Sequence, residues 1–157
     1  HKRCYMKLDE TLYKKFPVLL REKLLNDEIA FPDTTQIDYE PLWTYRAVER
    51  QKDDRRGISR EDFRSYFELN KKPKMPRGLR GGDITKDPYY YGVSSFLNKE
   101  IVEQKMKFPN PNKKMAAGYV CKEGGPQDTK DSHVCWWLFE DADVSGFRLM
   151  EDSQNEG

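Results

Sequence analysis

The feature that constrains the fold most is an almost uninterrupted apolar run at residues 133–139. All six residues of the stretch 134–139 are apolar, and two of them are the adjacent tryptophans Trp136 and Trp137. A strand that alternates apolar and polar residues has one face in solvent, whereas a continuous apolar run is typical of a strand covered on both faces. We therefore expect a central, buried β-strand at residues 133–139.

The rest of the chain is very polar and yet rich in aromatic residues. Charged residues make up 35% of the 157 residues, the mean hydropathy is −0.97, and Phe, Trp and Tyr together make up 13%. A chain that is disordered throughout is poor in aromatic residues, and a membrane-spanning helix needs about 18 consecutive apolar residues, a run that this sequence lacks. The length suits one compact domain. We expect a single domain over 1–157, with flexible tails at 1–7 and 151–157.

Charge is balanced over the whole chain but unevenly distributed along it. The 28 Lys and Arg residues against 27 Asp and Glu residues give a formal charge of +1, which argues against nucleic-acid binding driven by overall charge. Residues 70–88 nevertheless form a long loop rich in Pro and Gly, and loops longer than about 12–15 residues are usually functional or disordered. Five basic residues in this loop lie within ten positions of one another: Lys71, Lys72, Lys74, Arg77 and Arg80.

Three cysteines indicate the compartment in which the protein works. Cys4, Cys121 and Cys135 are odd in number, widely spaced and without a CxxC pair. This pattern favours a reduced, cytoplasmic protein. Because the sequence lacks a long apolar run, we also expect no membrane partner. Two thiolates together with His133 would be one ligand short of the set that a structural zinc site needs. We therefore expect no metal.

The order of predicted elements indicates an α+β fold. Apolar residues at helical spacing predict a helix over 9–29, with a break at Pro17. Further elements are expected at 41–49 (strand), 59–69 (short helix), 89–96 (strand), 98–107 (helix), 115–122 (strand), 133–139 (strand) and 147–149 (strand), with a polar loop at 124–132. We expect an N-terminal helix, a mostly antiparallel sheet of about five strands, and two further short helices.

Three polar residues lie within or beside the aromatic segments. Arg46, inside the apolar stretch 43–48, needs a carboxylate partner, or it points into a cleft and holds an anion such as a phosphate. Ser94, with Ser95 beside it, either caps the following helix or contacts a ligand phosphate or ribose. Glu140 ends the apolar run, where it either lines a cleft or simply reaches solvent. These alternatives remain open.

No Ser–His–Asp triad is indicated by the sequence. His133 is the only histidine besides His1, and nothing local marks a nucleophile elbow.

The order of these motifs resembles that of ADP-ribosyltransferase-like proteins, which include small NAD-consuming toxin domains built around Arg, Glu and Ser. The resemblance covers roughly residues 41–150. It rests on Tyr45-Arg46, on Tyr91-Gly92-Val93-Ser94-Ser95 and on Glu140. The chain lacks the Ser-Thr-Ser triplet and the Glu-x-Glu pair of that family.

The resemblance implies that the protein binds NAD and either cleaves it or transfers ADP-ribose, as a toxin or defence protein of bacterial or phage type. Arg46 would hold the NAD phosphates or ribose, Ser94 would order the site, and Glu140 would bond a ribose hydroxyl and aid the loss of nicotinamide. The catalytic glutamate would otherwise be Glu61, Glu68 or Glu100. The NAD-binding residues implied are Tyr45, Arg46, Tyr91 and Ser95, with the two tyrosines as stacking surfaces.

A different class of function remains open. The basic residues of the segment 71–82 would serve a non-catalytic module that binds nucleic acid or an acidic protein. Binding through about five phosphate contacts would weaken steeply with salt. The two proposed functions would therefore use different binding residues, and binding would depend on ionic strength to a different extent.

Overall fold

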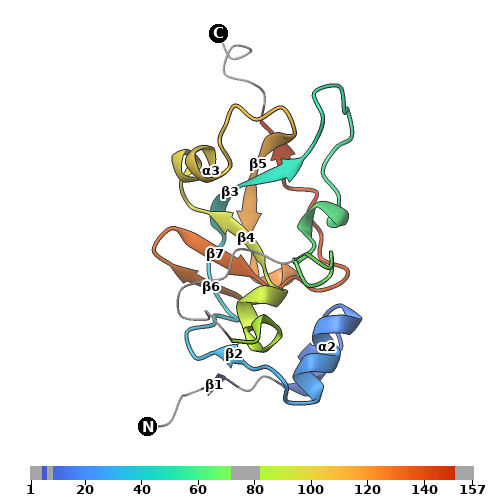
Figure 1. Ribbon diagram of the computed structural model, residues 1–157. Helices are drawn as coiled ribbons and strands as arrows, with labels where there is room; N and C mark the ends of the chain where they lie inside the picture. The colour runs from blue at the N-terminus through green and yellow to red at the C-terminus, as the bar shows by residue number, and fades with distance from the viewer. Residues whose placement is uncertain (1–4, 7–8, 72–81, 151–157) are drawn as a thin grey trace.

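The chain forms an α+β fold around a six-stranded sheet (Figure 1). The computed structural model describes residues 5–6, 9–71 and 82–150. The strand order is β6-β7-β4-β3-β5-β8, and all neighbouring strands are antiparallel. The strands are β3 (Leu42–Glu49), β4 (Val93–Phe96), β5 (Lys113–Val120), β6 (Gln127–Lys130), β7 (His133–Trp136) and β8 (Arg148–Leu149). The predicted α+β class is confirmed, and the sheet has six strands instead of about five.

The N-terminal segment forms two short helices and a small second sheet. Helix α1 (Glu10–Tyr13) begins after Asp9, whose side chain accepts a hydrogen bond from the Thr11 backbone N–H at 3.0 Å. Helix α2 (Val18–Leu25) starts directly after Pro17, which lacks an N–H and so interrupts the helix at the predicted position. Strands β1 (Tyr5–Met6) and β2 (Phe31–Pro32) pair beside these helices. The helix expected over 9–29 is thus two helices that end at Leu25.

Helix α3 (Lys99–Lys105) follows strand β4 and begins as the sequence predicts. Asn98 is its N-cap, and the side chain accepts a hydrogen bond from the Glu100 backbone N–H at 3.1 Å. The helix expected over 59–69 is only a 3₁₀ helix at Arg60–Phe63. None of the described helices is long and apolar enough to span a membrane.

The strand predicted over 89–96 is wrong in its first half. The Asp87 side chain accepts a hydrogen bond from the Tyr89 backbone N–H at 3.0 Å, and Pro88 occupies the first position of a 3₁₀ helix, Pro88–Tyr91. An acidic cap followed by proline is a helix-start signal. Because β4 begins only at Val93, the three tyrosines lie beside the sheet and not in it.

The loop predicted over 124–132 is also wrong, because it contains strand β6. This strand pairs with β7 residue by residue, from Gln127 opposite Trp136 to Lys130 opposite His133. β6 is an edge strand, and an edge strand can be short and polar, so its sequence lacks an apolar pattern. The apolar run leaves the sheet after Trp136, and β7 lies between β6 and β4 and not at the centre of the sheet.

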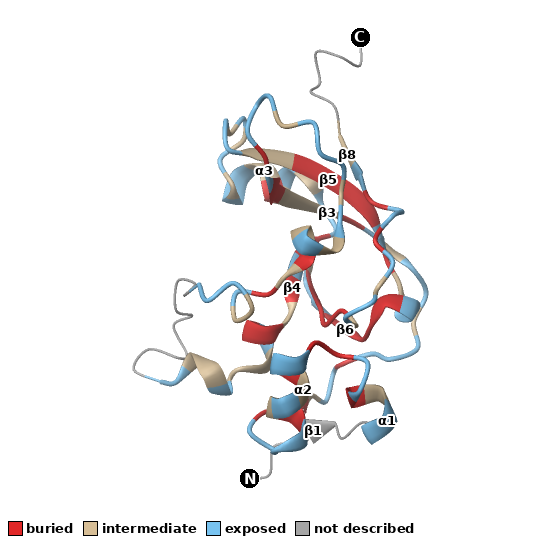
Figure 2. Cartoon of the chain, turned by 90° about the vertical axis from the view of Figure 1, so that its right-hand side faces the viewer, coloured by how far each residue is buried: buried red, intermediate tan, exposed pale blue. Residues whose placement is uncertain are grey.

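Strand register divides the side chains of the sheet between two faces. Tyr45 pairs with Phe96, Phe96 with His133, and Ser94 with Cys135, so these five residues share one face, here face A. The neighbouring positions point the opposite way and form face B: Arg46, Val93, Ser95, Val134 and Trp136. In Figure 2 the buried residues run along β4 and β5, and exposed residues occupy the outer loops.

The two faces are covered differently. Face B packs on one continuous apolar cluster that includes Phe63, Val120, Val134, Trp136, Leu138 and Phe147. Face A is covered at one end by the cluster around Phe96, Val102 and Met115, to which α3 contributes. A second cluster, with Phe16, Phe31, Tyr90, Tyr91, Cys135 and Trp137, covers the other end. The candidate site lies on face A between these two apolar clusters.

Candidate functional site

A cavity of about 660 Å³ opens on face A, between α3 and the 3₁₀ helix Pro88–Tyr91. Small-molecule sites in proteins commonly measure about 300–1,000 Å³. Strands β4 and β7 contribute Ser94, Phe96 and His133, and α3 contributes Ile101 and Lys105. The other lining residues are Tyr66, Ile84, Asp87, Tyr89, Tyr90, Lys130, Asp131 and Ser132. The cavity thus combines aromatic walls with hydroxyl groups and charges of both signs.

The polar centre of this cavity is a hydrogen bond of 2.9 Å between Ser94 Oγ and His133 Nε2. The two residues are diagonal neighbours across β4 and β7, so their side chains can meet on one face. Ser94 is exposed and His133 is half-buried. No local sequence signal marks this pair, since 39 positions separate the two residues and the strand register brings them together.

The surroundings of His133 favour its neutral form. Burial lowers the pKa of the imidazole below its ordinary value, and the Lys105 ammonium group lowers it further, while the Asp128 carboxylate opposes this. The ring packs against Phe96, with 5.2 Å between the ring centroids. Near pH 7 His133 is therefore a neutral, partly fixed imidazole that can accept a proton.

A buried carboxylate lies on face A next to this pair. Asp128 on β6 is 5% exposed and pairs with Cys135 across the β6–β7 ladder. Its Oδ2 accepts a hydrogen bond of 2.5 Å from the Tyr89 hydroxyl. Burial and this contact with Asp128 raise the pKa of Tyr89 above its ordinary value. Three adjacent strands thus carry Ser94, His133 and Asp128 on one face, with His133 on the middle strand.

Arg46 lies on face B and contacts backbone groups. Its Nη1 donates to the Ser94 carbonyl oxygen, its Nη2 donates to the Asp62 carbonyl oxygen at 3.0 Å, and its guanidinium lies 5.1 Å from the centre of the Phe63 ring. Strands β3 and β4 share only the pair Tyr45–Phe96, and Arg46 bridges them beyond that point. Burial lowers the pKa of Arg46 to about 10, so the side chain is charged at neutral pH. The structure gives Arg46 a bridging role in the sheet.

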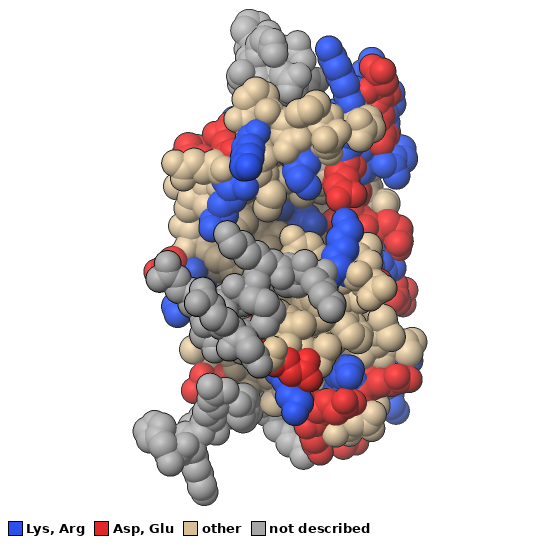
Figure 3. Space-filling view, in the orientation of Figure 1, with Lys and Arg blue, Asp and Glu red and all other residues tan. Residues whose placement is uncertain are grey.

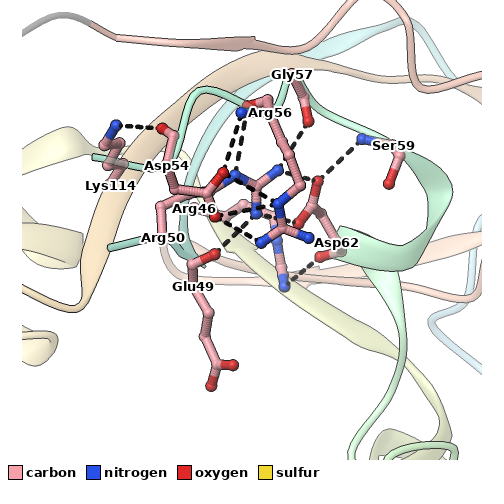
Figure 4. Close-up of polar contacts among 9 residues, drawn as sticks. All are labelled: Arg46, Glu49, Arg50, Asp54, Arg56, Gly57, Ser59, Asp62 and Lys114. Carbon is pink, nitrogen blue, oxygen red and sulfur yellow. Dashed lines mark hydrogen bonds and ion pairs between the residues drawn. The ribbon is translucent and has the colours of Figure 1, made fainter. Parts of the chain in front are cut away.

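A second arginine extends this network (Figure 4). Arg50 is 3% exposed and binds both carboxylate oxygens of Asp62, at 2.6 and 2.8 Å. It also donates to the carbonyl oxygens of Glu49 and Gly57, each at 2.8 Å. Although burial acts in the opposite direction, the hydrogen bonds from Arg50 hold the pKa of Asp62 below its ordinary value. Buried polar contacts therefore lie next to face B, although the Nε of Arg46 has no hydrogen-bond partner among the described residues.

Glu140 does not line the face A cavity. Its carboxylate pairs with Arg64 at 2.8 and 3.2 Å, and these hydrogen bonds lower the pKa of Glu140. Arg64 also binds Glu61 at 2.7 Å and Glu68 at 2.9 Å. Three of the four glutamates considered from the sequence thus surround the Arg64 guanidinium. Glu140 also lines a second cavity, of about 570 Å³, together with Lys14, Lys15 and Arg21. The fourth, Glu100, is exposed on α3.

The other residues implied by the resemblance are dispersed. Tyr45 packs with the face A cluster beside α3. Tyr91 is 3% exposed, its hydroxyl donates to the Thr85 carbonyl oxygen at 2.6 Å, and burial raises its pKa to about 12. Ser95 is buried on face B, and among the described residues its hydroxyl has no hydrogen-bond partner. Of the predicted site residues, only Ser94 lines the face A cavity.

The basic segment remains a prediction, because most of it lies outside the described residues: Lys72, Lys74, Arg77 and Arg80. Lys71 is described, and its ammonium group pairs with Glu49 at 3.1 Å. Cys121 and Cys135 are free thiols, and Cys4 lies outside the described part. Figure 3 shows charges of both signs interspersed over the visible face of the described chain.

Comparison of this chain with protein-family models, with curated proteins and with solved structures finds no match. The face A cavity offers a neutral base beside a hydroxyl, cations at the wall and aromatic rings. This arrangement can hold a polar ligand with a flat ring and can move a proton at Ser94.

Proposed function

We propose that the protein binds a ligand of the nucleotide class in the face A cavity, and that NAD is the first ligand to test. One observation carries this proposal. The Ser94–His133 hydrogen bond lies in a cavity that also presents aromatic rings and the Lys105 ammonium group. A nucleotide combines a flat base, ribose hydroxyls and phosphates, and each of these finds a chemical counterpart in the lining.

Aromatic side chains supply the counterpart of the base. Tyr66 and Tyr89 line the cavity and are 46% and 42% exposed. Exposed rings at a cavity wall provide stacking surfaces, and base–aromatic stacking contributes about 1–3 kcal/mol per base in nucleic-acid complexes. Phe96 adds an apolar surface beside His133. The tyrosines used here differ from Tyr45 and Tyr91, which the resemblance implied.

Polar side chains supply the counterparts of ribose and phosphate. Ser94 and neutral His133 offer donors and acceptors for ribose hydroxyls. Among the described lining residues, Lys105 and Lys130 are the two lysines and suit a phosphate, and Asp87 and Asp131 balance their charge. Burial raises the pKa of Asp87 above its ordinary value. The balanced charge favours a ligand that carries both a phosphate and neutral polar groups over a bare anion.

NAD cleavage or ADP-ribosyl transfer is the enzymatic part of the proposal. This chemistry needs an anion-binding group, a stacking surface and a carboxylate in one cleft. In the cavity, Lys105 takes the place foreseen for Arg46, and Asp87 or Asp131 takes the place foreseen for Glu140. The enzymatic part is tested separately, by the release of nicotinamide from NAD.

Calorimetric titration with NAD, ADP-ribose and AMP tests the binding proposal. We expect saturable one-site binding, and Lys105→Met should weaken it about fivefold, because an exposed ion pair contributes about 1 kcal/mol. Lys99→Met is the matched control, since Lys99 lies on the same helix but does not line the cavity. Absence of heat and of any shift in the His133 NMR signals at millimolar ligand would overturn the proposal.

A further inference from the structure

Sheet register aligns a serine, a histidine and an aspartate on face A, although the sequence shows no triad. Ser94 on β4 pairs with Cys135 on β7, and Cys135 pairs with Asp128 on β6. His133 lies two positions before Cys135 on the same strand, so it is diagonal to both Ser94 and Asp128. Diagonal neighbours in antiparallel sheets are close enough for long side chains to interact.

The contacts of Ser94 and His133 suit general-base catalysis. The Ser94 hydroxyl and His133 Nε2 are 2.9 Å apart, which is the distance expected between a nucleophile and its base. Ser94 is exposed and lines the cavity, so a substrate can reach its hydroxyl. The Phe96 ring restricts the imidazole from one side.

The neighbours of His133 act on its charge in opposite directions. Lys105 from α3 disfavours the imidazolium, whereas Asp128 from β6 favours it. Lys130 from β6 is the direct cross-strand partner of His133, and Asp131 follows in the hairpin turn. Asp128 is held in place by the hydrogen bond from the Tyr89 hydroxyl. Asp128 lies on the strand next to His133, on the side away from β4, and its hydrogen-bond partner is the Tyr89 hydroxyl, with no hydrogen bond to the imidazole among the described residues.

We propose that Ser94 is a nucleophile, that His133 is its general base, and that the cavity hydrolyses esters of small carboxylic acids, with Asp128 as a positioning residue for His133. The apolar lining residues Ile84, Phe96 and Ile101 suit a small apolar acyl group. This activity needs the cavity but does not depend on nucleotide binding.

The reaction proceeds in two balanced steps. In the first, His133 Nε2 takes the Ser94 hydroxyl proton while Oγ bonds to the acyl carbon, the ester C–O bond breaks, and the leaving alcohol receives the proton from His133. In the second, His133 takes a proton from water, and the resulting hydroxide bonds to the acyl carbon. The bond from Oγ to the acyl carbon then breaks, and Ser94 regains its proton from His133.

A fluorophosphonate probe tests the nucleophile directly, because such probes react with serines activated by a base. We expect the wild-type protein to gain one adduct, located at Ser94 by peptide mass spectrometry. Ser94→Ala should lose the adduct completely, and this variant removes only an exposed hydroxyl, so the fold is retained. Ser145→Ala should label like wild type, since Ser145 is also an exposed serine but does not line the cavity. His133→Gln should slow labelling at least about 100-fold.

Two outcomes would overturn the proposal. One is folded wild-type protein that remains unlabelled, and the other is Ser94→Ala that labels as fast as wild type. Titration of Ser94→Ala with NAD is a separate measurement, so a failure of ester chemistry is distinguishable from a failure of nucleotide binding.

A pH profile tests the positioning role of Asp128. The labelling rate should fall as His133 becomes protonated, with a midpoint below about 6.5, the ordinary pKa of histidine. Asp128→Asn removes the anion that favours the imidazolium, so the midpoint should move to lower pH and the plateau rate should fall. The new amide oxygen can still accept the Tyr89 hydrogen bond, and a merely structural role of Asp128 would leave the midpoint unchanged.

Discussion

The two faces of the sheet use polar side chains in opposite ways. On face B and beside it, Arg46 and Arg50 direct their donors to backbone carbonyls and to Asp62. On face A, Ser94 and His133 bond to each other at the edge of an open cavity. The first arrangement leaves little for a ligand to bind, while the second keeps polar atoms accessible. We infer that the arginine network stabilises the fold and that the cavity carries the function.

This difference shows why a charged residue in an apolar strand is an ambiguous functional signal. A buried guanidinium must be paired, and backbone carbonyls can pair it as well as a phosphate can. The two terminal nitrogens of Arg46 meet this requirement where β3 and β4 separate, while its Nε has no partner among the described residues. What distinguishes a ligand-binding group is an accessible cavity beside it, and only the fold reveals that cavity.

The largest change expected is from breaking the buried ion pair. Arg50→Met leaves the Asp62 carboxylate without its main partner, and removing one member of a buried pair typically costs about 3–5 kcal/mol. Urea unfolding should show a reduced free energy of unfolding of this size. Arg56→Met is the matched control, since Arg56 pairs with Asp54 on the surface, and its effect should be much smaller. Equal stability of wild type and Arg50→Met would contradict a structural role for the network.

A second substitution separates stability from binding. Arg46→Met removes two hydrogen bonds from a charged donor and leaves two carbonyl groups unpaired, which we expect to cost about 2 kcal/mol of unfolding free energy. The affinity for NAD should stay within about twofold of wild type, because Arg46 lies on face B. Urea unfolding and calorimetric titration of the same preparation measure both quantities.

The pH dependence of stability should report on His133. Its pKa is lower in the folded than in the unfolded protein, so the unfolded chain binds the proton more readily as the pH falls. The stability is therefore full above about 6.5, the unfolded histidine pKa, and is lost as the pH falls through the folded pKa. His133→Gln should remove this slope between pH 5 and 6.5 in thermal unfolding. The pKa of Asp62 is also lowered, so Asp62 should make stability depend on pH in a more acidic range. That dependence should remain in the His133→Gln variant.

The smallest change expected is at the glutamate that the resemblance favoured. Glu140→Gln weakens one of three carboxylate contacts of Arg64, and the Glu140 side chain is 46% exposed. Solvent screening limits such pairs, so the free energy of unfolding should change by less than about 1 kcal/mol. NAD binding to the face A cavity should be unchanged. A large loss of NAD affinity would instead support a role for Glu140 at the binding site.

Local sequence signals predicted a good part of the fold. Asn98 marks the start of α3, Pro17 separates the first two helices, and the aromatic stretch at 41–49 is strand β3. The wrong predictions concern two segments whose structure depends on their place in the fold more than on their own apolar pattern. The Asp87-Pro88 cap makes the tyrosines a 3₁₀ helix, and β6 is polar because it lies at the edge of the sheet.

The site could be predicted only in small part. Ser94 stood out because two hydroxyls lie where a strand meets a helix, and it does line the cavity. Its partners His133 and Lys105 come from β7 and α3, and their proximity depends on strand register and helix packing. Nothing in the local sequence around either residue encodes that proximity. Arg46 stood out for a sound reason, the cost of burying a charge, but that reason does not say which face the side chain occupies.

The central claim is that function resides in the face A cavity and not in the arginine network. The most direct test is calorimetric titration of NAD into Lys105→Met and Arg46→Met side by side, at a temperature where circular dichroism shows both variants folded. We expect that Lys105→Met weakens binding about fivefold, a loss of about 1 kcal/mol, and that Arg46→Met binds like wild type. Folded Arg46→Met that has lost NAD affinity, with Lys105→Met unaffected, would contradict a binding site on face A.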